Sequence, residues 1–400
     1  MRRLSLVYIT LCATGMAIPV AGQRVDSASQ VMVAPGVVHR HLTVGEGPWS
    51  VHVIEVDLRQ PGISIRAAHA GDKLRGRETV TAMVQRKTSD TARIVAAINA
   101  DFFDLRTGED ENNQVVEGEI YKGLKVTSAP ADPSHHIHSQ FGVTGSGRPL
   151  IDTFAFHGAV IRASGSVTRL DGINYRASAS ALVLYTSRAG DAVPWDSTVA
   201  TRDVRLRYVA QRRDTSVYQV TSYPMAGGTA LLGDGPVLSI PVTDDSVRET
   251  PKPGEMIRIQ TNLQPAPIGL RTVVGGWPRL IVHGQSIADS IDRIEGTFKT
   301  SFVGRNPRTG IGFSRDSTTL YLITVDGRQE GSDGMSLAEF AALMIRVGVF
   351  EGLNLDGGGS TAMVVDGTLV NTPSDTDPKT KQHVERTVGN ALLVVQSRHD

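Results

Sequence analysis

The stretch that decides the fold of this chain runs Asn354-Leu355-Asp356-Gly357-Gly358-Gly359-Ser360-Thr361. Three consecutive glycines cost chain entropy, so a fold keeps them where the backbone needs unusual angles or approaches another group closely. They directly follow a short apolar strand. Such a turn can point several N–H groups into one concavity that suits an anion, and Asp356 places a carboxylate beside it. A plain tight turn capped by aspartate explains the run about equally well on local grounds.

The elements around this stretch follow local rules. Ser336 and Glu339 form a capping box, which predicts a helix that starts at Ser336 and ends near Gly348. Its apolar face comprises Leu337, Phe340, Leu343, Met344 and Val347. Residues 364–370 predict a hairpin with Asp366-Gly367 at its turn. Residues 390–395 predict a final buried strand.

The remaining sequence is also rich in predicted strands. Residues 51–58 alternate at period two, 78–86 fit a helix, and 92–99 form a buried strand. Further on, short strands at 181–186, 204–211 and 217–222 are separated by polar turns. We therefore expect an α+β, β-rich fold with a mixed central sheet, few helices and a hairpin-rich middle region. Residues 129–265 are expected to form an elaboration or sub-domain of a domain that spans 23–400.

The first 22 residues are typical of a signal peptide. Arg2 and Arg3 precede an apolar run, and Val20-Ala21-Gly22 supplies small residues for cleavage. The sequence therefore predicts an exported protein, periplasmic or extracellular, with no membrane span after cleavage. The single cysteine, Cys12, lies inside this segment, so the mature chain has no thiol chemistry.

Composition excludes some partners. The 400 residues carry a formal net charge of zero and no Lys/Arg stripe, so nucleic acid is not an expected partner. Only 5% of residues are aromatic, which argues against a surface of stacked aromatic platforms. The short run with His135, His136 and His138 lacks the spacing of a metal site, and we interpret it as a solvated loop.

Polar residues gather at several predicted strand ends. Asn99 and Asp101 end the strand over 92–99, which predicts either a ligand site or an Asx-type turn. Arg308, Arg328 and Arg386 flank three other strands, and arginine is the natural fork for a phosphate or carboxylate.

Taken in order, these segments resemble the phosphodiester glycosidase family over roughly residues 90–128 and 270–396. The motifs that carry the resemblance are Ala97-Ile98-Asn99-Ala100-Asp101-Phe102-Phe103-Asp104, Gly275-Gly276-Trp277-Pro278-Arg279-Leu280, Arg308-Thr309-Gly310-Ile311-Gly312, Val325-Asp326-Gly327-Arg328, Gly334-Met335-Ser336-Leu337, Asn354 to Thr361, Val365-Asp366-Gly367, Asn371-x-Pro373-Ser374 and Arg386-x-Val388-x-Asn390-Ala391.

The resemblance implies a hydrolase of carbohydrate metabolism that acts on a sugar-1-phosphodiester and releases the sugar and a phosphomonoester. We expect cleavage on the C1–O side, and the N-terminal segment predicts that the enzyme is exported. The resemblance also implies Asp356 or Asp101 as the catalytic carboxylate. The substrate-binding residues it implies are Asn99, Arg308, Thr309, Asp326, Arg328, Gly357, Gly358, Gly359, Ser360, Thr361, Arg386 and Asn390. Because phosphate is a good leaving group, a second carboxylic acid is expected to matter less than in other glycosidases. No cofactor and no metal ligands are expected.

Two alternatives stay open at this point. Ala100 and Trp277 depart from the usual family pattern, as a non-catalytic exported glycan-binding module would. A metal-dependent phosphodiesterase would instead cleave the P–O bond with a divalent cation.

Overall fold

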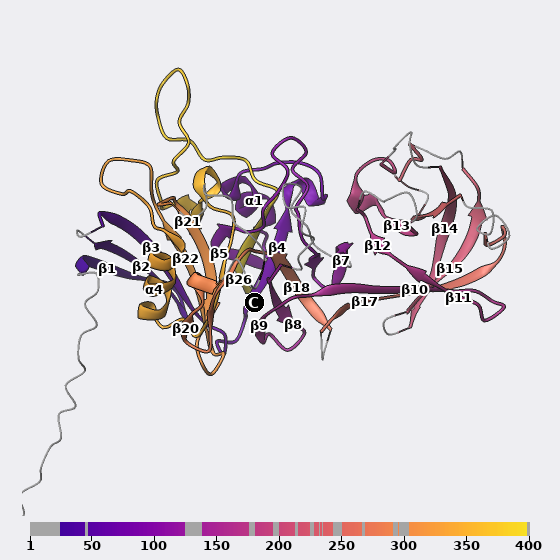
Figure 1. Cartoon of the computed structure of the whole chain (residues 1–400), viewed down its shortest axis with the longest axis horizontal. Helices are drawn as coiled ribbons and strands as arrows, with labels where there is room; N and C mark the ends of the chain where they lie inside the picture. The colour runs from indigo at the N-terminus through magenta and orange to yellow at the C-terminus, as the bar shows by residue number, and fades with distance from the viewer. Residues whose placement is uncertain are drawn as a thin grey trace, which may run out of the picture.

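The computed structural model describes residues 25–44, 47–124, 138–175, 181–194, 200–212, 215–224, 228–231, 233, 235–242, 250–265, 269–290, 295 and 304–397. Within these residues the fold is built on three sheets (Figure 1). Two of them form a layered body with two α-helices, and the third extends from this body to a second part whose described residues are mostly in strands. The expected β-rich α+β fold is therefore confirmed.

The first sheet has eight strands, each antiparallel to its neighbour. In spatial order they are β1 Val25–Ala34, β2 Val37–Val44, β3 Trp49–Asp57, β22 Thr319–Val325, β21 Arg308–Phe313, β23 Glu351–Asn354, β19 Arg279–Val282 and β20 Gln285–Ser286. The alternation predicted for residues 51–58 places Ile54 and Val56 on the inner face. On the outer face, Val51 and Val53 pack under the helix α4.

The second sheet faces the first across the main core. Its strands, in spatial order, are β25 Thr368–Leu369, β24 Met363–Val365, β5 Ala92–Asn99, β26 Asn390–Ser397 and β4 Ile63–His69. Ile98 and Leu392 of this sheet pack in one apolar cluster with Ile311 and Leu353 of the first. Burial of these side chains fixes the distance between the ends of β5, β21 and β23, where the polar motifs lie.

The third sheet has thirteen strands and is mixed, because β12 and β13 run parallel. Its order is β11 Val167–Leu170, β10 Ala155–Ile161, β17 Met256–Gln264, β15 Thr215–Ser222, β14 Thr201–Arg212, β16 Val237–Pro241, β13 Val183–Tyr185, β12 Gly172–Ile173, β7 Glu119–Leu124, β6 Gln114–Val116, β18 Leu270–Gly275, β8 Gln140–Thr144 and β9 Pro149–Asp152. Figure 1 shows β10 and β17 running from the body into the second part.

Two α-helices cover the outer faces of the first two sheets: α1 Val80–Lys87 and α4 Leu337–Val347. The helix α4 has the predicted capping box of Ser336 and Glu339, and Gly348 ends it with a left-handed φ of 112°. The α1 helix starts two residues later than predicted, because Thr79 caps it by accepting a hydrogen bond from Ala82 N. Short 3-10 turns are η1 Ala70–Asp72, η2 Ser187–Ala189, η3 Ala288–Ser290 and η5 Gly358–Ser360.

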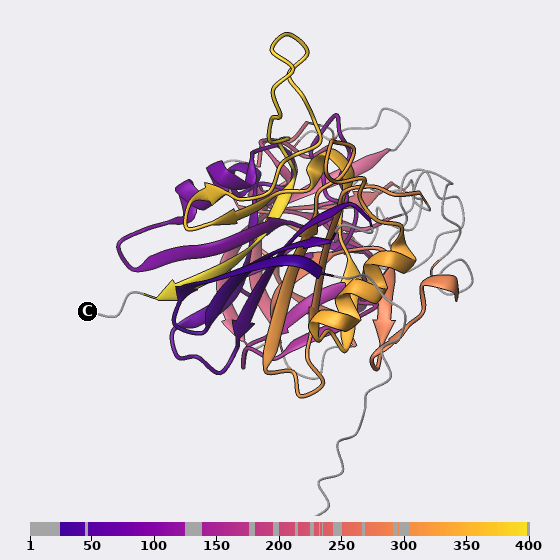
Figure 2. The same ribbon diagram turned by 90° about the vertical axis from the view of Figure 1, so that its left-hand side faces the viewer.

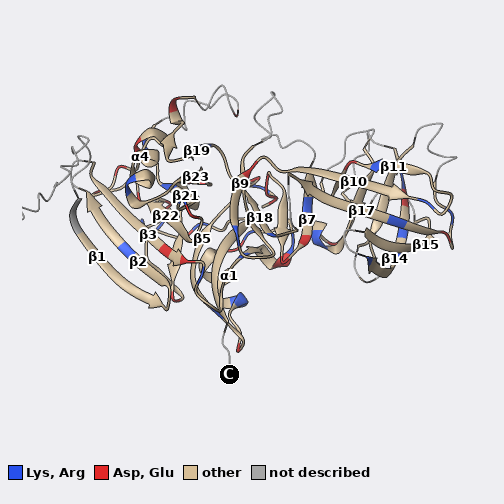
Figure 3. Ribbon diagram, turned by 90° about the horizontal axis from the view of Figure 1, so that it is seen from below, with Lys and Arg blue, Asp and Glu red and all other residues tan. Residues whose placement is uncertain are grey.

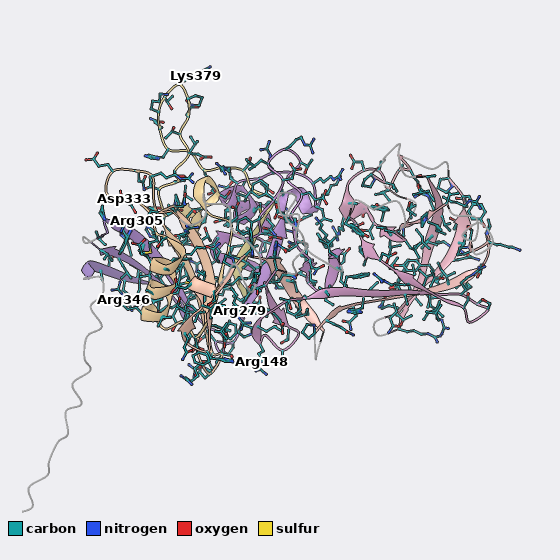
Figure 4. The ribbon with its side chains drawn as sticks, viewed as in Figure 1. Arg148, Arg279, Arg305, Asp333, Arg346 and Lys379 are labelled. Atoms are coloured by element: carbon teal, nitrogen blue, oxygen red, sulfur yellow. The ribbon has the colours of Figure 1, made fainter. Side chains whose placement is uncertain are left out.

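Several surface features are visible in the other views. A loop after β25 projects from the body and carries Lys379 at its tip (Figures 2 and 4). Basic and acidic residues are interspersed over the ribbon in Figure 3. No helix of the described residues has the length and apolar character needed to cross a membrane. The predicted signal peptide, His135 and His136 lie outside the described residues.

The structure corrects one detail of the histidine-rich run. His138 is buried, and its ring stacks on Trp277 with 4.7 Å between centroids. The prediction of a solvated loop is therefore wrong for His138, because the indole ring of Trp277 packs against its imidazole.

Candidate active site

The polar motifs meet at one edge of the two facing sheets. Gly310 pairs with Asn354 in the antiparallel register, which brings the start of β21 beside the end of β23. The chain then turns directly into the three glycines. A cavity of about 210 Å³ lies here. It is lined by Phe102, Asn306, Arg308, Arg328, Asn354, Leu355, Asp356, Gly357, Gly358, Gly359 and Arg386.

The N–H groups of the glycine turn bind acceptors within the protein. Gly358 N–H donates to Pro307 O at 2.9 Å, and Ser360 N–H to Gly357 O at 3.1 Å. Gly357 N–H serves the Asp356 carboxylate. These three N–H groups therefore have protein acceptors, as in the plain capped turn that was one of the two interpretations of this run. The glycines instead make room, since a Cβ on Gly359 would lie 2.1 Å from Arg386 Nη2.

Two arginine side chains, Arg308 and Arg328, line the cavity and lie close enough for their charges to interact. Arg308 is 3% exposed, and it donates to Met335 O at 2.8 Å and Gly304 O at 2.9 Å. Arg328 donates to Asn306 Oδ1 at 2.7 Å. Burial and the nearby charge of Arg328 lower the pKa of Arg308 to about 10. Two like charges held this close favour an anionic ligand between them.

Arg386 is neutralised by a partner of its own. It forms a bidentate pair with Asp375, at 2.7 Å and 2.9 Å, and its third nitrogen lies 3.5 Å from Ser360 Oγ. Both residues belong to the projecting loop that follows β25. Arg386 therefore anchors this loop on the glycine turn and adds little net charge to the cavity.

Asp356 is the carboxylate that lines the cavity. Burial raises its pKa to about 6, although hydrogen bonds from Ser360 and Gly357 and the charge of Arg386 work in the opposite direction. A carboxyl group with a pKa near neutrality can exchange protons under ordinary conditions, which is the property that acid–base catalysis needs. Ser360 itself is fully buried and reaches the site only through these contacts.

Asn99, a predicted substrate-binding residue, lies behind the glycine turn and holds it in place with side-chain hydrogen bonds. Its Nδ2 donates to Asp356 O at 2.6 Å, while its Oδ1 accepts from Thr309 Oγ1 at 2.9 Å and from Ala362 N at 3.1 Å. Thr309 Oγ1 also lies 3.4 Å from Thr361 Oγ1. All three predicted binding side chains are buried. They do not line the cavity and hold its wall in place instead.

Asp326 and Asn390 are also buried outside the cavity lining. Asp326 accepts from Asn371 Nδ2 at 3.2 Å and from Thr372 N at 3.1 Å, and burial raises its pKa. Asn390 accepts from Asp101 N at 2.9 Å and donates to Gln114 Oε1 at 3.0 Å. Both side chains tie neighbouring loops together.

Asp101, the other predicted catalytic carboxylate, is enclosed. Asn112 donates to it from its backbone at 3.1 Å and from its amide at 2.7 Å, and Gln114 Nε2 lies at 2.5 Å. Burial raises its pKa well above the usual value, and the charge of Asp110 adds to the rise. The side chain is 2% exposed and does not line the cavity.

The structure adds a carboxyl group that the sequence did not single out. Glu111 N–H donates to the backbone oxygen of Phe102, a cavity-lining residue, at 2.9 Å. Burial raises the pKa of Glu111 to about 7, and the charge of Asp356 is the next largest cause. Glu111 lies in an irregular loop with no motif around it, so no pattern in the sequence could have found it.

Asn354 and Phe102 are further cavity residues missing from the prediction. Asn354 Nδ2 donates to Trp277 O at 2.7 Å, but its buried Oδ1 has no partner among the described residues. An acceptor left open at a cavity wall suits a ligand hydroxyl or N–H group. Trp277 lies behind both residues and packs edge-on against Phe102, with 6.4 Å between ring centroids. Asn354 stands in the quoted motif, so its position was a usable signal.

Within the ranges that the structure describes, no group of three or more His, Cys, Asp or Glu side chains is placed to hold a metal ion.

Comparison with known proteins addresses the family. Residues 243–395 match the model of the phosphodiester glycosidase family. The N-acetylglucosamine-1-phosphodiester alpha-N-acetylglucosaminidase of Bos taurus is 36% identical over 91 residues, which is 23% of this chain and 17% of that protein. The chain thus matches only a small part of the length of this curated relative.

Two crystal structures share the fold over most of the chain. A hypothetical protein from Synechocystis has a TM-score of 0.69 at 20% identity, covering 92% of this chain and 64% of the other. A candidate exported protein from Burkholderia pseudomallei K96243 has a TM-score of 0.64 at 23% identity, covering 87% and 74%. These likenesses show the fold alone, and the likeness to the phosphodiester glycosidase family rests on the sequence match over residues 243–395.

Proposed function

We propose that this protein is an exported hydrolase that cleaves a sugar-1-phosphodiester between the sugar C1 and its oxygen. The observation that carries the proposal is the cavity itself. Its lining combines one carboxylate, that of Asp356, with the guanidinium groups of Arg308 and Arg328. The family match supports the same reaction class.

The charges of the cavity suit a phosphodiester. A phosphodiester carries one negative charge, and guanidinium groups bind its oxygens with charge-assisted hydrogen bonds. Arg308 is fixed by two backbone carbonyls and Arg328 by Asn306, so both are already oriented before the substrate arrives. Their charge also stabilises the phosphomonoester as it leaves with the bonding electron pair.

The sugar would occupy the other side of the cavity. The ring of Phe102 offers an apolar wall to the C–H face of a pyranose, and Asn354 Oδ1 offers an acceptor for a hydroxyl or acetamido N–H group. Such contacts fix the anomeric carbon relative to Asp356. They do not depend on which sugar is bound.

The reaction then needs one ionised carboxyl group, and a second, protonated carboxyl group can assist the leaving phosphate. Asp356, with a pKa of about 6, is the group that is ionised first and supports the positive charge at C1 or removes a proton from water. Glu111, with a pKa of about 7, keeps its proton longer and can deliver it to the departing phosphate oxygen. The water oxygen ends on the sugar C1, and the phosphomonoester leaves.

The roles of the two predicted carboxylates differ in this proposal. Asp356 is the catalytic group, because it lines the cavity. Asp101 supports the site from behind through Asn390 and Gln114. The predicted export, to the periplasm or the extracellular space, rests on the N-terminal segment, and the candidate exported relative is compatible with it.

Isotope labelling tests the bond that breaks. The mature protein is incubated in ¹⁸O-water with a panel of sugar 1-phosphate methyl esters, and the products are analysed by mass spectrometry. We expect ¹⁸O in the sugar. Label in the phosphate would instead favour the P–O phosphodiesterase. If no ester of the panel is hydrolysed, the non-catalytic module is favoured.

Matched variants test the assignment of the carboxylates. Asp356→Asn is expected to abolish turnover, whereas Asp101→Asn should lower it mainly through folding, which circular dichroism and thermal unfolding monitor. If both variants hydrolyse the substrate at the wild-type rate, the proposal is overturned.

A further inference from the structure

A second, larger cavity lies on the concave face of the thirteen-stranded sheet. The strand β10 packs against β7 and β12, so the sheet curls back on itself. Figure 1 shows the two ends of this sheet in the body and in the second part, with β10 and β17 between them. The cavity measures about 600 Å³, against about 210 Å³ for the candidate active site. Ligand pockets typically span about 300–1,000 Å³ and often lie at the mouths of curled sheets.

The floor of this cavity is apolar. Alternation along β17 turns Ile259 and Leu263 to the concave side, where Ile173 of β12 and Leu184 of β13 face them. These side chains belong to the apolar cluster that holds the curled sheet together. They are themselves only 1–4% exposed, so the apolar surface that a ligand reaches beside them is that of the partly buried Ile120.

The rim of the cavity is polar but nearly uncharged. Ser216 Oγ donates to Gln211 Oε1 at 2.5 Å, and Tyr218 hydrogen-bonds with Ser216. Thr261 adds a hydroxyl on the same face of β17 as Ile259. Amide and hydroxyl groups of this kind both donate and accept hydrogen bonds, so they suit ligands that carry several hydroxyl groups.

The charge of the lining separates this cavity from the candidate active site. Among the described residues that line it, Glu119 is the sole formally charged one. Its carboxylate is occupied by Arg188, at 2.8 Å and 3.1 Å. No guanidinium group of the lining faces the cavity, so a phosphate would lose its water shell here without a partner.

We propose that this concave face is a second, non-catalytic site that binds a neutral oligosaccharide. A pyranose ring has an apolar C–H face and a rim of hydroxyl groups, which matches an apolar floor under a rim of amides and hydroxyls. The half-buried ring of Tyr218, packed edge-on against Tyr208 at 5.9 Å, supplies a fixed flat surface beside the floor. The inference does not depend on the proposed hydrolase reaction.

Glycan binding by the mature protein tests the proposal. An array of neutral gluco-, manno-, galacto- and N-acetylglucosamine oligosaccharides is screened first, and the strongest binder is then titrated by calorimetry. Tyr218→Ala removes the ring, and Thr261→Phe fills the cavity. Tyr223→Ala is the matched control, since Tyr223 lies just beyond β15 and does not line the cavity.

We expect saturable binding of at least one oligosaccharide, at least tenfold weaker in Tyr218→Ala and Thr261→Phe and unchanged in Tyr223→Ala. Phe102→Ala separates the two cavities, because Phe102 lines the candidate active site alone. Loss of binding in Phe102→Ala but not in Tyr218→Ala would assign the sugar to the active site and overturn the proposal. The absence of binding to every glycan of the array would also overturn the proposal. A third contrary result is an apolar dye that fluoresces in the cavity of the wild type but not of Thr261→Phe, while no sugar binds.

Discussion

Replacing Asp356 by asparagine should make the protein more stable at neutral pH than the wild type. Burial raises the pKa of Asp356 from 3.8 to about 6. In that pH range the folded protein retains a proton that the unfolded chain has already released, so the stability of the wild type falls as pH rises. At about 1.4 kcal/mol per pKa unit, the loss is complete above pH 6 and reaches at most about 3 kcal/mol. Solvent that reaches the carboxylate from the cavity reduces this figure.

The variant lacks this penalty because an amide does not ionise. The pKa of Glu111 acts in the same direction, since the charge of Asp356 contributes to its rise. Other buried carboxyls titrate in both proteins, so the informative quantity is the difference in unfolding free energy between the variant and the wild type. We expect this difference to grow by about 2–3 kcal/mol between pH 4 and pH 8.

Urea denaturation at five pH values between 4 and 8 measures this difference. Asp90→Asn, at an exposed position, controls for the substitution itself. A difference for Asp356→Asn that stays constant over the whole range, or that shrinks as pH rises, would show that the carboxylate is not held in a desolvated place. The role of Asp356 as a group that titrates near neutrality would then fail with it.

Three further substitutions test the other parts of the site. Arg328→Gln should lower kcat/KM on a sugar-1-phosphodiester by about 10- to 100-fold, since a charged hydrogen bond contributes about 1.5–3 kcal/mol. Arg346→Gln on α4 (Figure 4) is the control, and equal effects of the two substitutions would refute an anion site. Glu111→Gln should reduce kcat about 100-fold and remove the fall in rate above pH 7, and an unchanged alkaline limb would exclude Glu111 as the acid. Asn99→Leu should lower the unfolding free energy by about 3 kcal/mol or more, because it leaves buried groups without partners; a loss under about 1 kcal/mol in urea denaturation would contradict this role of Asn99.

The elements that the sequence predicts well are those fixed by local contacts. Ser336 and Glu339 lie three residues apart and satisfy each other's backbone donors, so their capping box can be recognised without any tertiary information. Asp366 and Gly367 both adopt positive φ, of 50° and 78°, as the predicted hairpin turn requires.

The direction of a side chain at a strand end is harder to predict. Asn99 and Asp356 both follow apolar strands and both belong to shared motifs, yet Asn99 points into the protein and Asp356 lines the cavity. The direction of each side chain depends on which hydrogen-bond partners the neighbouring strands supply. The residue spacing within one strand does not contain that information. The position of Glu111 is equally hard to predict, because the fold of an irregular loop brings it close enough to Asp356 for their charges to interact.

The packing of the glycine turn also depends on distant residues. The run of glycines marks a close approach, and the side chains of Arg328 and Arg386 are among the groups that approach it. A Cβ on Gly358 would lie 3.3 Å from Arg328 Nη2. Sequence alone predicts the space, whereas the identity of its occupant requires the fold.

The charge balance of the cavity links these observations to the choice of ligand. Arg386 is cancelled by Asp375, which leaves two positive guanidinium groups and the negative Asp356 among the lining residues. The cavity thus carries about one net positive charge, and a phosphodiester carries one negative charge. The phosphomonoester product approaches two negative charges near neutrality, so the balance no longer matches once the C1–O bond is broken. An enzyme that favours the charge of its substrate over that of its product avoids retaining the product. Arg386→Gln leaves the charge of Asp375 without its partner, so we expect this substitution to weaken substrate binding although Arg386 adds little net charge to the cavity.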